Sequence, residues 1–504
     1  MKFCPKCNLK YDDKYKFCKK CGSLLKSKNN INNLSIDVTS SSKLDRLKDY
    51  IKLPKSKKNV IVCLLVLLIV GTGCLYNQFG KDMGFRYKFY DMGIISPKTA
   101  DEQFEYAVSI FSQNRELEAF DWFIKSAEQG HFMSQYTLFI MYFEGKGVKK
   151  DYKKGLEWCI KAAEQGYDVA QRRLAHIYET GTDVNSPLLK IIEPNPAEAF
   201  KWYMKLAQSG DKKAEHYIGD AYYFGNGVDK NLSESFNWRL KSAEHGNEND
   251  YFSVASMYVS GEGTNKDSKK AFEWFLKSAE SGDATAQYNV SLMYFKGDGI
   301  VKNDKESFKW LLKAAEQDYV DAYAFVGCCY ILGDTVEKNV EEGIKWLLKA
   351  EEHNKCTAND YAILAGCYYF GDGVAKNYKE AFKWYLKSAE LGDAGSQNMI
   401  GNMYFYGNGV NQDNNQAFKW YRKSALQGNA DAQCALGLAY INGDGTYVNE
   451  YEGFNWLVKS ANQGNAGGQY FLSRCYRDGV GTTRNYIQAQ KWLQKAIANG
   501  YPVD

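Results

Sequence analysis

Residues 393–429 read DAGSQNMIGNMYFYGNGVNQDNNQAFKWYRKSALQGN, and this stretch holds one complete copy of a motif that fills most of the chain. Small and apolar residues recur at helical spacing in its first third and predict one helix, which the Gly-Asn-Gly at 407–409 ends. Apolar residues at i, i+3, i+4 and i+7 around Trp420 predict a second helix from about 414 to 427, closed by Gly428. The motif therefore predicts a pair of helices, A and B, joined by a glycine turn.

The tryptophans show how often the motif is repeated. All eleven fall in one series, with eight of the ten spacings at 36 residues and the other two at 44 and 38: Trp122, Trp158, Trp202, Trp238, Trp274, Trp310, Trp346, Trp384, Trp420, Trp456 and Trp492. A period of this size is typical of an array in which each repeat buries its apolar face against its neighbours. We therefore predict that all eleven rings lie in the core.

The phrases around the tryptophans, such as WFIKSAEQG, WYLKSAELG and WYRKSALQG, and the Gly-x-Gly turns before them resemble the Sel-one-like repeat of the tetratricopeptide-like superfamily. The resemblance implies an all-α fold, a right-handed α/α solenoid of about eleven helix pairs over residues 98–504. It also implies a concave face, lined by the A helices, that binds a protein or peptide ligand. We expect contacts from exposed members of the tyrosine-rich stretches at 222–223, 368–369 and 404–406.

Two interruptions and one variant turn depart from the regular pattern. The 44-residue step contains an insert, TDVNSPLLKIIEPNP, over 182–196, predicted as a surface loop that is either a specificity element or a tolerated insertion. The 38-residue step contains EEHNKCTAND at 351–360, where the entry to the next helix A is rebuilt. In the first repeat, Ser-Gln-Asn-Arg at 112–115 replaces the glycine turn and suggests a cap on the array.

The amino-terminal residues 1–25 predict a metal site. They hold Cys4, Cys7, Cys18 and Cys21 as two C-x2-C knuckles, a spacing that presents four thiolates to one tetrahedral Zn²⁺. Two disulfides in a secreted mini-domain are the alternative. Because four cysteines saturate the ion, we expect a structural zinc ribbon without an open catalytic position.

A basic linker over 26–58 leads to an apolar segment. Residues 1–58 carry fifteen Lys and one Arg against five Asp, a net charge of +11; since the whole chain is +4, the remainder carries 4 − 11 = −7. Leu44, Leu47 and Ile51 share one helical face, so 43–53 is either an interfacial helix on an anionic lipid surface or a solvated linker. Residues 60–76, VIVCLLVLLIVGTGCLY, carry no charge and predict a transmembrane helix over 59–77, followed by a linker over 78–97.

The charge distribution also predicts the topology. Six Lys/Arg lie between 46 and 58, against Lys81, Arg86 and Lys88 after the apolar segment. The positive-inside rule therefore predicts a single-pass protein with a cytoplasmic N-terminus and extracytoplasmic repeats. The reverse topology, with the repeats acting as a cytoplasmic-facing signalling scaffold, is an alternative.

Catalytic patterns do not emerge from the repeats. The five histidines show neither H-x3-H nor H-E-x-x-H spacing, and the Gly-x-Gly turns do not continue into a phosphate loop. We read the recurring Lys and Glu of KSAEQG as solvated ion pairs and the repeat cysteines Cys329, Cys367 and Cys475 as small core residues. We thus predict a membrane-anchored scaffold that is not an enzyme and has no nucleic-acid partner; a cell-envelope protein that binds or processes peptidoglycan is the alternative.

Overall fold

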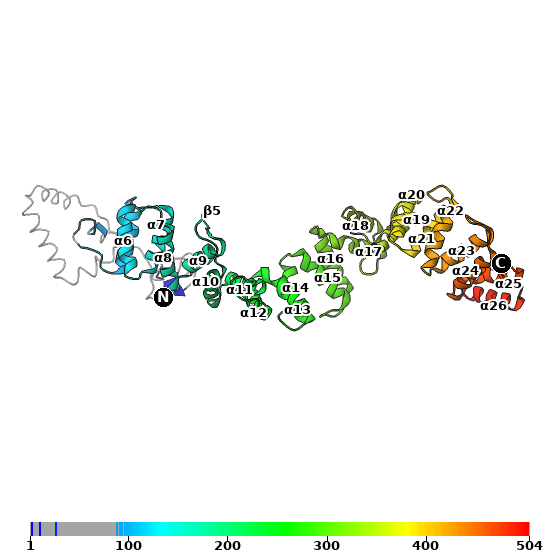
Figure 1. Ribbon diagram of the computed structural model, residues 1–504, viewed down its shortest axis with the longest axis horizontal. Helices are drawn as coiled ribbons and strands as arrows, with labels where there is room; N and C mark the ends of the chain where they lie inside the picture. The colour runs from blue at the N-terminus through cyan, green and yellow to red at the C-terminus, as the bar shows by residue number, and fades with distance from the viewer. Residues whose placement is uncertain are drawn as a thin grey trace, which may run out of the picture. The chain divides into compact units, whose positions relative to one another are not determined.

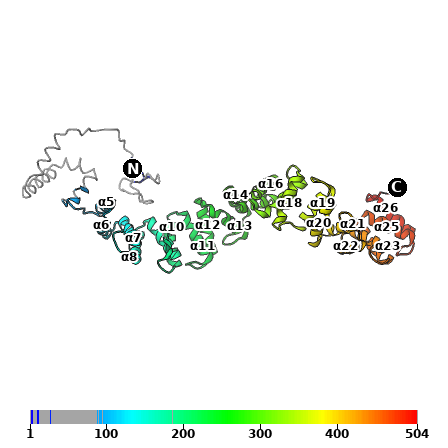
Figure 2. The same ribbon diagram turned by 90° about the horizontal axis from the view of Figure 1, so that it is seen from above.

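The computed structural model describes residues 2–3, 10–11, 26–27, 87–88, 90–93, 95–184 and 186–502, as drawn in Figures 1 and 2. The strands β1 (Lys2–Phe3), β2 (Lys10–Tyr11) and β3 (Lys26–Ser27) form an antiparallel sheet in the order β2-β1-β3. The predicted zinc ligands Cys4, Cys7, Cys18 and Cys21 and the predicted transmembrane segment 59–77 lie outside the described residues.

Residues 100–498 form twenty-two α-helices that pair along the chain, which confirms the predicted solenoid of eleven helix pairs. The A helices are α5 (Ala100–Phe111), α7 (Phe132–Glu144), α9 (Asp168–Thr180), α11 (Lys212–Phe224), α13 (Tyr251–Ser260), α15 (Ala284–Lys296), α17 (Tyr323–Leu332), α19 (Ala358–Phe370), α21 (Ala394–Tyr406), α23 (Ala430–Asn442) and α25 (Ala466–Asp478). The B helices are α6 (Glu116–Glu128), α8 (Tyr152–Glu164), α10 (Pro196–Gln208), α12 (Leu232–Glu244), α14 (Ser268–Glu280), α16 (Asp304–Glu316), α18 (Val340–Glu352), α20 (Tyr378–Glu390), α22 (Asn414–Leu426), α24 (Glu450–Asn462) and α26 (Tyr486–Ala498). Two short 3-10 helices, η1 (Glu248–Asp250) and η2 (Val320–Ala322), precede α13 and α17.

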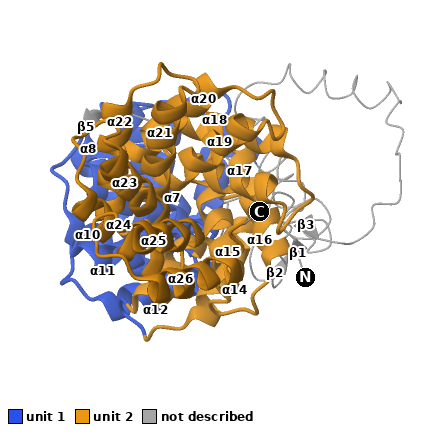
Figure 3. Cartoon of the chain, turned by 90° about the vertical axis from the view of Figure 1, so that its right-hand side faces the viewer, with its two compact units in different colours: residues 1–250, 262–264 blue, residues 251–261, 265–504 orange. Residues whose placement is uncertain are grey.

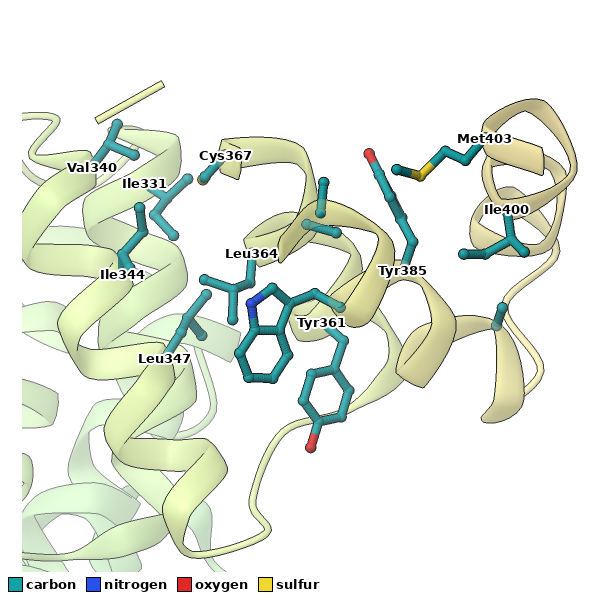
Figure 4. Packing of buried hydrophobic residues seen from close by; sticks show 14 residues of the cluster. Ile331, Val340, Ile344, Leu347, Tyr361, Leu364, Cys367, Tyr385, Ile400 and Met403 are labelled. Carbon is teal, nitrogen blue, oxygen red and sulfur yellow. The ribbon is translucent and has the colours of Figure 1, made fainter. Parts of the chain in front are cut away.

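The chain divides into two compact units, coloured separately in Figure 3. Unit 1 comprises residues 1–250 and 262–264, and unit 2 comprises residues 251–261 and 265–504. Each unit has its own apolar clusters. In unit 2, Figure 4 shows one cluster running from Ile344 and Leu347 of α18 through Leu364 of α19 and Tyr385 of α20 to Met403 of α21.

Each helix pair begins and ends with the same local chemistry. In the pair α21–α22, Gly407 takes the left-handed conformation at φ 73° and ends helix A with a hydrogen bond from its N–H to the Met403 carbonyl. The Asp413 side chain then accepts from the backbone N–H groups of Asn415 and Gln416 and starts helix B. Helix length is therefore set by the sequence at both ends.

The second glycine of each Gly-x-Gly turn controls the contact with the preceding helix B. Gly409 has φ 73°, and an added Cβ would come within 3.0 Å of the carbonyl oxygen of Tyr378, the first residue of α20. Six equivalent glycines meet the carbonyl of the first residue of the preceding helix B in the same way, whereas Gly373 meets the Val340 side chain there: Gly147, Gly227, Gly263, Gly299, Gly445 and Gly481. The turns thus serve packing, in agreement with the structural interpretation of the sequence.

A ladder of buried amides links successive helices. Gln397 of α21 donates to the Ala389 carbonyl at the end of α20, and its own oxygen accepts from Gln427 at 2.8 Å. The same rung recurs in the pairs that start with α7, α15 and α23. In α11 a carboxylate, Glu215, stands at this position. Where the residue is glutamine, its side chain thus joins three consecutive helices through two hydrogen bonds.

The prediction that all eleven tryptophans are core residues is wrong for eight of them. Only Trp202, Trp274 and Trp384 are buried, and the other eight rings are partly exposed. The lysine three residues later covers each ring: Lys423 Nζ, for example, lies 4.0 Å from the Trp420 ring centroid, and the range over all eleven is 3.7–5.1 Å. These lysines therefore make cation–π contacts, and within residues 95–502 none forms the predicted ion pair with the glutamate three positions on.

The insert at 182–196 is more ordered than the predicted surface loop. The strands β4 (Thr182–Asp183) and β5 (Ser186–Lys190) pair as an antiparallel hairpin, a small departure from an all-α fold. The buried Asp183 carboxylate lies 2.6 Å from Arg173 Nε of α9, and Ile191 and Ile192 pack on the apolar cluster beneath. The hairpin is thus fixed by a buried ion pair that sequence periodicity does not reveal.

Two B helices of unit 2, α16 and α18, are followed by a residue other than the usual closing glycine. Asp318 and Asn354 occupy its place with φ 61° and 55°, a conformation that Asn and Asp tolerate better than most residues. Asp318 also accepts from the Tyr323 hydroxyl and pairs with Lys349.

Part of the predicted linker 78–97 packs on the first helix pair, because Tyr90 is buried against Tyr106 of α5.

Replacing Gly409 by Ala is expected to lower the free energy of unfolding of unit 2 by about 3 kcal/mol, because the methyl group would collide with the Tyr378 carbonyl. Gly428→Ala is the matched control, since Gly428 has φ 94° but nothing within 4 Å of an added Cβ; its cost should be about 1 kcal/mol of backbone strain. Urea unfolding followed by circular dichroism measures both. Equal losses in the two variants would show that the interhelix contact does not limit packing.

Candidate binding surface

Each A helix leaves one face outside the core. In α21, Gln397, Ile400, Gly401 and Met403 are buried against the B helices on either side, whereas the side chains one turn apart on the remaining face are partly or fully exposed. We call this remaining face of the A helices the open face. Its composition varies between repeats because no packing contact fixes it.

Most of the tyrosines predicted as contacts are packing residues. Tyr404 meets Phe382 of α20, helix B of the preceding pair, edge-on, with ring centroids 5.3 Å apart and planes at 89°. The same pair recurs at Tyr222 with Phe200 and along the rest of the array: Phe120–Tyr142, Phe272–Tyr294, Phe308–Tyr330, Phe418–Tyr440 and Phe454–Tyr476. Tyr368 is partly buried and packs against the apolar cluster of α18 to α21. These tyrosines are therefore not among the exposed members of the stretches to which the prediction applies.

Tyr223 and Tyr369 of the same stretches also pack against neighbouring side chains, whereas Tyr406 is largely exposed to solvent. The Tyr223 ring lies under Arg239, and Tyr369 packs against Tyr378 at 5.0 Å. Tyr406, in contrast, is 68% exposed. It is the last residue of its helix A, directly before the turn glycine, and this position could have been recognised in the sequence as the outer end of the open face.

That terminal position is apolar in three successive A helices of unit 2. Leu332, Phe370 and Tyr406 end α17, α19 and α21 and are 56%, 72% and 68% exposed. Behind them the open face carries small or apolar residues such as Ile363 and Gly366, where an added Cβ would meet nothing closer than 3.8 Å. We call Leu332, Phe370, Tyr406 and the residues behind them the apolar strip.

A pocket of about 150 Å³ lies where the strip reaches α21, α22 and α23. The Tyr421 hydroxyl donates to Asn402 Oδ1 at 2.8 Å on its wall. The pocket combines aromatic rings with amide and carboxylate groups: Asn402, Phe405, Tyr406, Asn414, Ala417, Phe418, Tyr421, Ala435, Leu438, Ala439, Asn442 and Asp444 line it.

In unit 1 α11 also ends on an exposed apolar residue, Phe224, but the rest of its open face carries charged groups. His216 Nδ1 lies 2.7 Å from the buried carboxylate of Asp250, and Asp220 pairs with Arg239 at 2.6 Å. The hydrogen bond with Asp250 raises the pKa of His216 above its usual value, against an opposing effect of burial. One residue away, Glu215 is fully buried and lies 2.7 Å from His245 Nδ1. Because both carboxylates have basic partners, this cluster is structural.

Metal-binding groupings are absent from the part of the chain that the structure describes. No three His, Cys, Asp or Glu side chains there could hold a metal ion. The seven repeat cysteines are free, and Cys329, Cys367 and Cys475 are buried, which confirms their prediction as core residues. Burial raises the pKa of Cys434 to about 12 and that of Cys367 to about 11, so these thiols are poor nucleophiles. No helix among the described residues is long and apolar enough to span a membrane.

The stacked helix pairs define an all-helical solenoid. The Sel1 repeat matches eleven successive segments between residues 112 and 501, so the chain belongs to the Sel1 repeat family. The first segment covers α6 alone, and each of the others corresponds to one helix pair: 112–131, 133–167, 168–211, 212–247, 251–283, 284–319, 320–355, 360–393, 394–429, 430–465 and 466–501. Proteins with such repeats generally act as scaffolds for protein–protein interaction.

Solved structures of similar proteins come from several bacteria. A protective antigen of uropathogenic Escherichia coli with an SLR fold is 32% identical over 82% of this chain and 87% of its own, with a TM-score of 0.48. A Sel1 repeat protein from Oxalobacter formigenes is 31% identical over 49% of this chain and 96% of its own, with a TM-score of 0.40. Cysteine-rich protein B of Helicobacter pylori is 27% identical over 26% and 92%, with a TM-score of 0.20. No curated protein matches the chain.

The raised pKa of His216 predicts a pH-dependent contribution to stability. Because the folded-state pKa lies above the unfolded value, the stabilisation is fully present below about pH 6.5 and is lost as the pH rises through the folded-state pKa. We expect the loss of unfolding free energy in His216→Gln to shrink as the pH is raised from 6 to 9. Urea unfolding of the Asp250→Asn protein, with and without His216→Gln, is the control; the same pH dependence there would rule out Asp250 as its cause.

Proposed function

We propose that the protein is a membrane-anchored, non-enzymatic scaffold that captures a polypeptide segment on the open face of its A helices in unit 2. The observation that carries the proposal is the apolar strip, where Leu332, Phe370 and Tyr406 stand exposed at equivalent positions. Packing does not require large apolar side chains there, since Asn442 and Asp478 end the following A helices. Exposed apolar residues gathered on one face are typical of protein interaction sites.

The size of the strip suits a partner of moderate affinity. Burying a side chain such as Leu or Phe stabilises a complex by about 1.5–3 kcal/mol when it starts fully exposed, so three partly exposed residues contribute a few kcal/mol together. Hydrogen bonds to the amides of the neighbouring pocket would add to this and fix the register of a bound segment.

The proposal for the amino-terminal region rests on sequence. Cys4, Cys7, Cys18 and Cys21 would hold one structural Zn²⁺, and the antiparallel pairing of β1 with β2 supports a compact module there, since it joins residues on both sides of the first knuckle. The segment 59–77 would anchor the chain, with the basic residues before it on the cytoplasmic side and the repeats outside.

Two alternatives remain distinct in what they would bind or where they would act. Aromatic and amide side chains of the pocket could also contact a glycan, which would make the protein a peptidoglycan-binding component of the cell envelope. Reversed topology would place the apolar strip in the cytoplasm as a signalling scaffold.

Site-specific photocrosslinking in cells expressing the full chain tests the proposed surface. A photoreactive phenylalanine analogue at Phe370 or Tyr406 should give a discrete protein adduct, because a bound segment covers these positions. Leu391 and Leu426 are matched controls at the other ends of the helix pairs, 61% and 63% exposed, and should give no such adduct. Equal crosslinking at all four sites, or adducts sensitive to a muramidase, would contradict protein capture at the strip.

The amino-terminal proposals have their own measurements. The purified full chain should carry one zinc ion, and Cys4→Ser or Cys18→Ser should lose it while Cys356→Ser in the repeats keeps it, as measured by elemental analysis. Labelling of a cysteine engineered near Asp504 with a membrane-impermeant thiol reagent should succeed on intact cells. Labelling only after lysis would favour the cytoplasmic alternative.

A further inference from the structure

We propose that the pocket formed by α21, α22 and α23 binds the side chain of a lysine or arginine from the captured polypeptide. This inference rests on the proposed function and deepens it by naming the chemistry that the partner must present. The origin, the size, the wall residues and the charge of the pocket support this inference.

The pocket exists because of one residue that differs between successive helix pairs. Asn414, the first residue of α22, stands where the preceding pair has Tyr378, 36 residues earlier. The Tyr378 ring packs against Tyr369 at 5.0 Å and fills the equivalent space in that pair. In the pair that follows, Arg474 stands at the place of Leu438. The open pocket is therefore a local feature of this repeat.

The size and the walls of the pocket fit one long side chain. Its volume of about 150 Å³ is well below the ~300–1,000 Å³ of pockets that hold a drug-sized ligand. Phe405, Tyr406, Phe418 and Tyr421 line it, and aromatic faces suit both the methylene stem and the cationic end of Lys or Arg.

Two acceptors of the pocket have capacity left for a partner's donor. Asn414 Oδ1 is buried without a hydrogen-bond partner within the protein. Asp444 accepts from Asn442 Nδ2 at 3.3 Å but, within the described chain, pairs with no Lys or Arg. The equivalent turn residue two repeats earlier, Asp372, is by contrast paired with Lys338 at 2.9 Å. Since no lysine or arginine lines the pocket, its acceptors and its negative charge are available to a partner's cation.

An anionic ligand is excluded by the same groups, because Asp444 would repel it and its own oxygens would leave Asn414 Oδ1 unsatisfied. A sugar could stack on the aromatic walls, so glycan binding is treated as an outcome of the test. The position of the pocket beside Tyr406 means that a segment lying on the apolar strip would place one cationic side chain next to an apolar one.

The test uses the full-length chain in detergent and a library of random 12-residue peptides, followed by fluorescence anisotropy on the selected sequences. We expect a Lys or Arg in the selected peptides, and we expect its replacement by norleucine to weaken binding about tenfold or more, as for a charge-assisted hydrogen bond. In Asn414→Tyr and Asp444→Asn the two peptides should bind equally. Asn414→Tyr reproduces the residue of the neighbouring pair and should leave the helical circular dichroism unchanged.

The outcomes separate this inference from the function on which it rests. Peptides that need Phe370 but bind equally well with norleucine, or equally well to Asp444→Asn, would overturn the cation pocket and leave the scaffold intact. Failure to select any peptide would overturn both. Binding of purified muropeptides to the unmodified chain but not to Asn414→Tyr would overturn the cation pocket in favour of a glycan.

Discussion

The contact between the second turn glycine and the backbone that begins the preceding helix B constrains everything else in the array. At Gly409 the approach to the Tyr378 carbonyl leaves no room for a methyl group. The contact sets the distance between successive helix pairs. Because this distance is short, the buried positions of helix B hold small residues, alanine and serine. It uses backbone atoms, so it can recur without requiring the same side chains elsewhere. The open face is consequently free to vary.

The fold could be predicted from the sequence because its determinants are local. The spacing of the tryptophans, the turn glycines and the Asp or Asn caps fix helix number and ends, and the observed bounds of α21 and α22 match the predicted ones closely. The core status of Trp420 was predicted wrongly because period alone does not show that a lysine on the next turn covers the outer half of the ring. The hairpin in the insert was missed because it depends on a buried ion pair between Arg173 and Asp183.

The binding surface was predicted less well, for a physical reason. The recurring tyrosines of the sequence, such as Tyr404, each pack edge-on against a phenylalanine of helix B in the preceding pair. The residues available to bind a partner are those that make no such packing contact, and they therefore do not recur with the repeat. Their chemistry differs between helices: His216 and Asp220 lie on α11 beside the exposed Phe224, whereas Leu332 and Phe370 end α17 and α19.

The amide ladder has a consequence for how such a chain can change over generations. A rung made of Gln397 and Gln427 offers the same donor and acceptor to either neighbour, so loss or duplication of a 36-residue block by recombination would rejoin compatible surfaces. The rung at Glu215 has no such freedom, because its carboxylate depends on His245 of the same pair. Repeat number can therefore change at any of the pairs that share this rung, such as those starting with α7, α15, α21 and α23, while the pair α11–α12 must be inherited as one block.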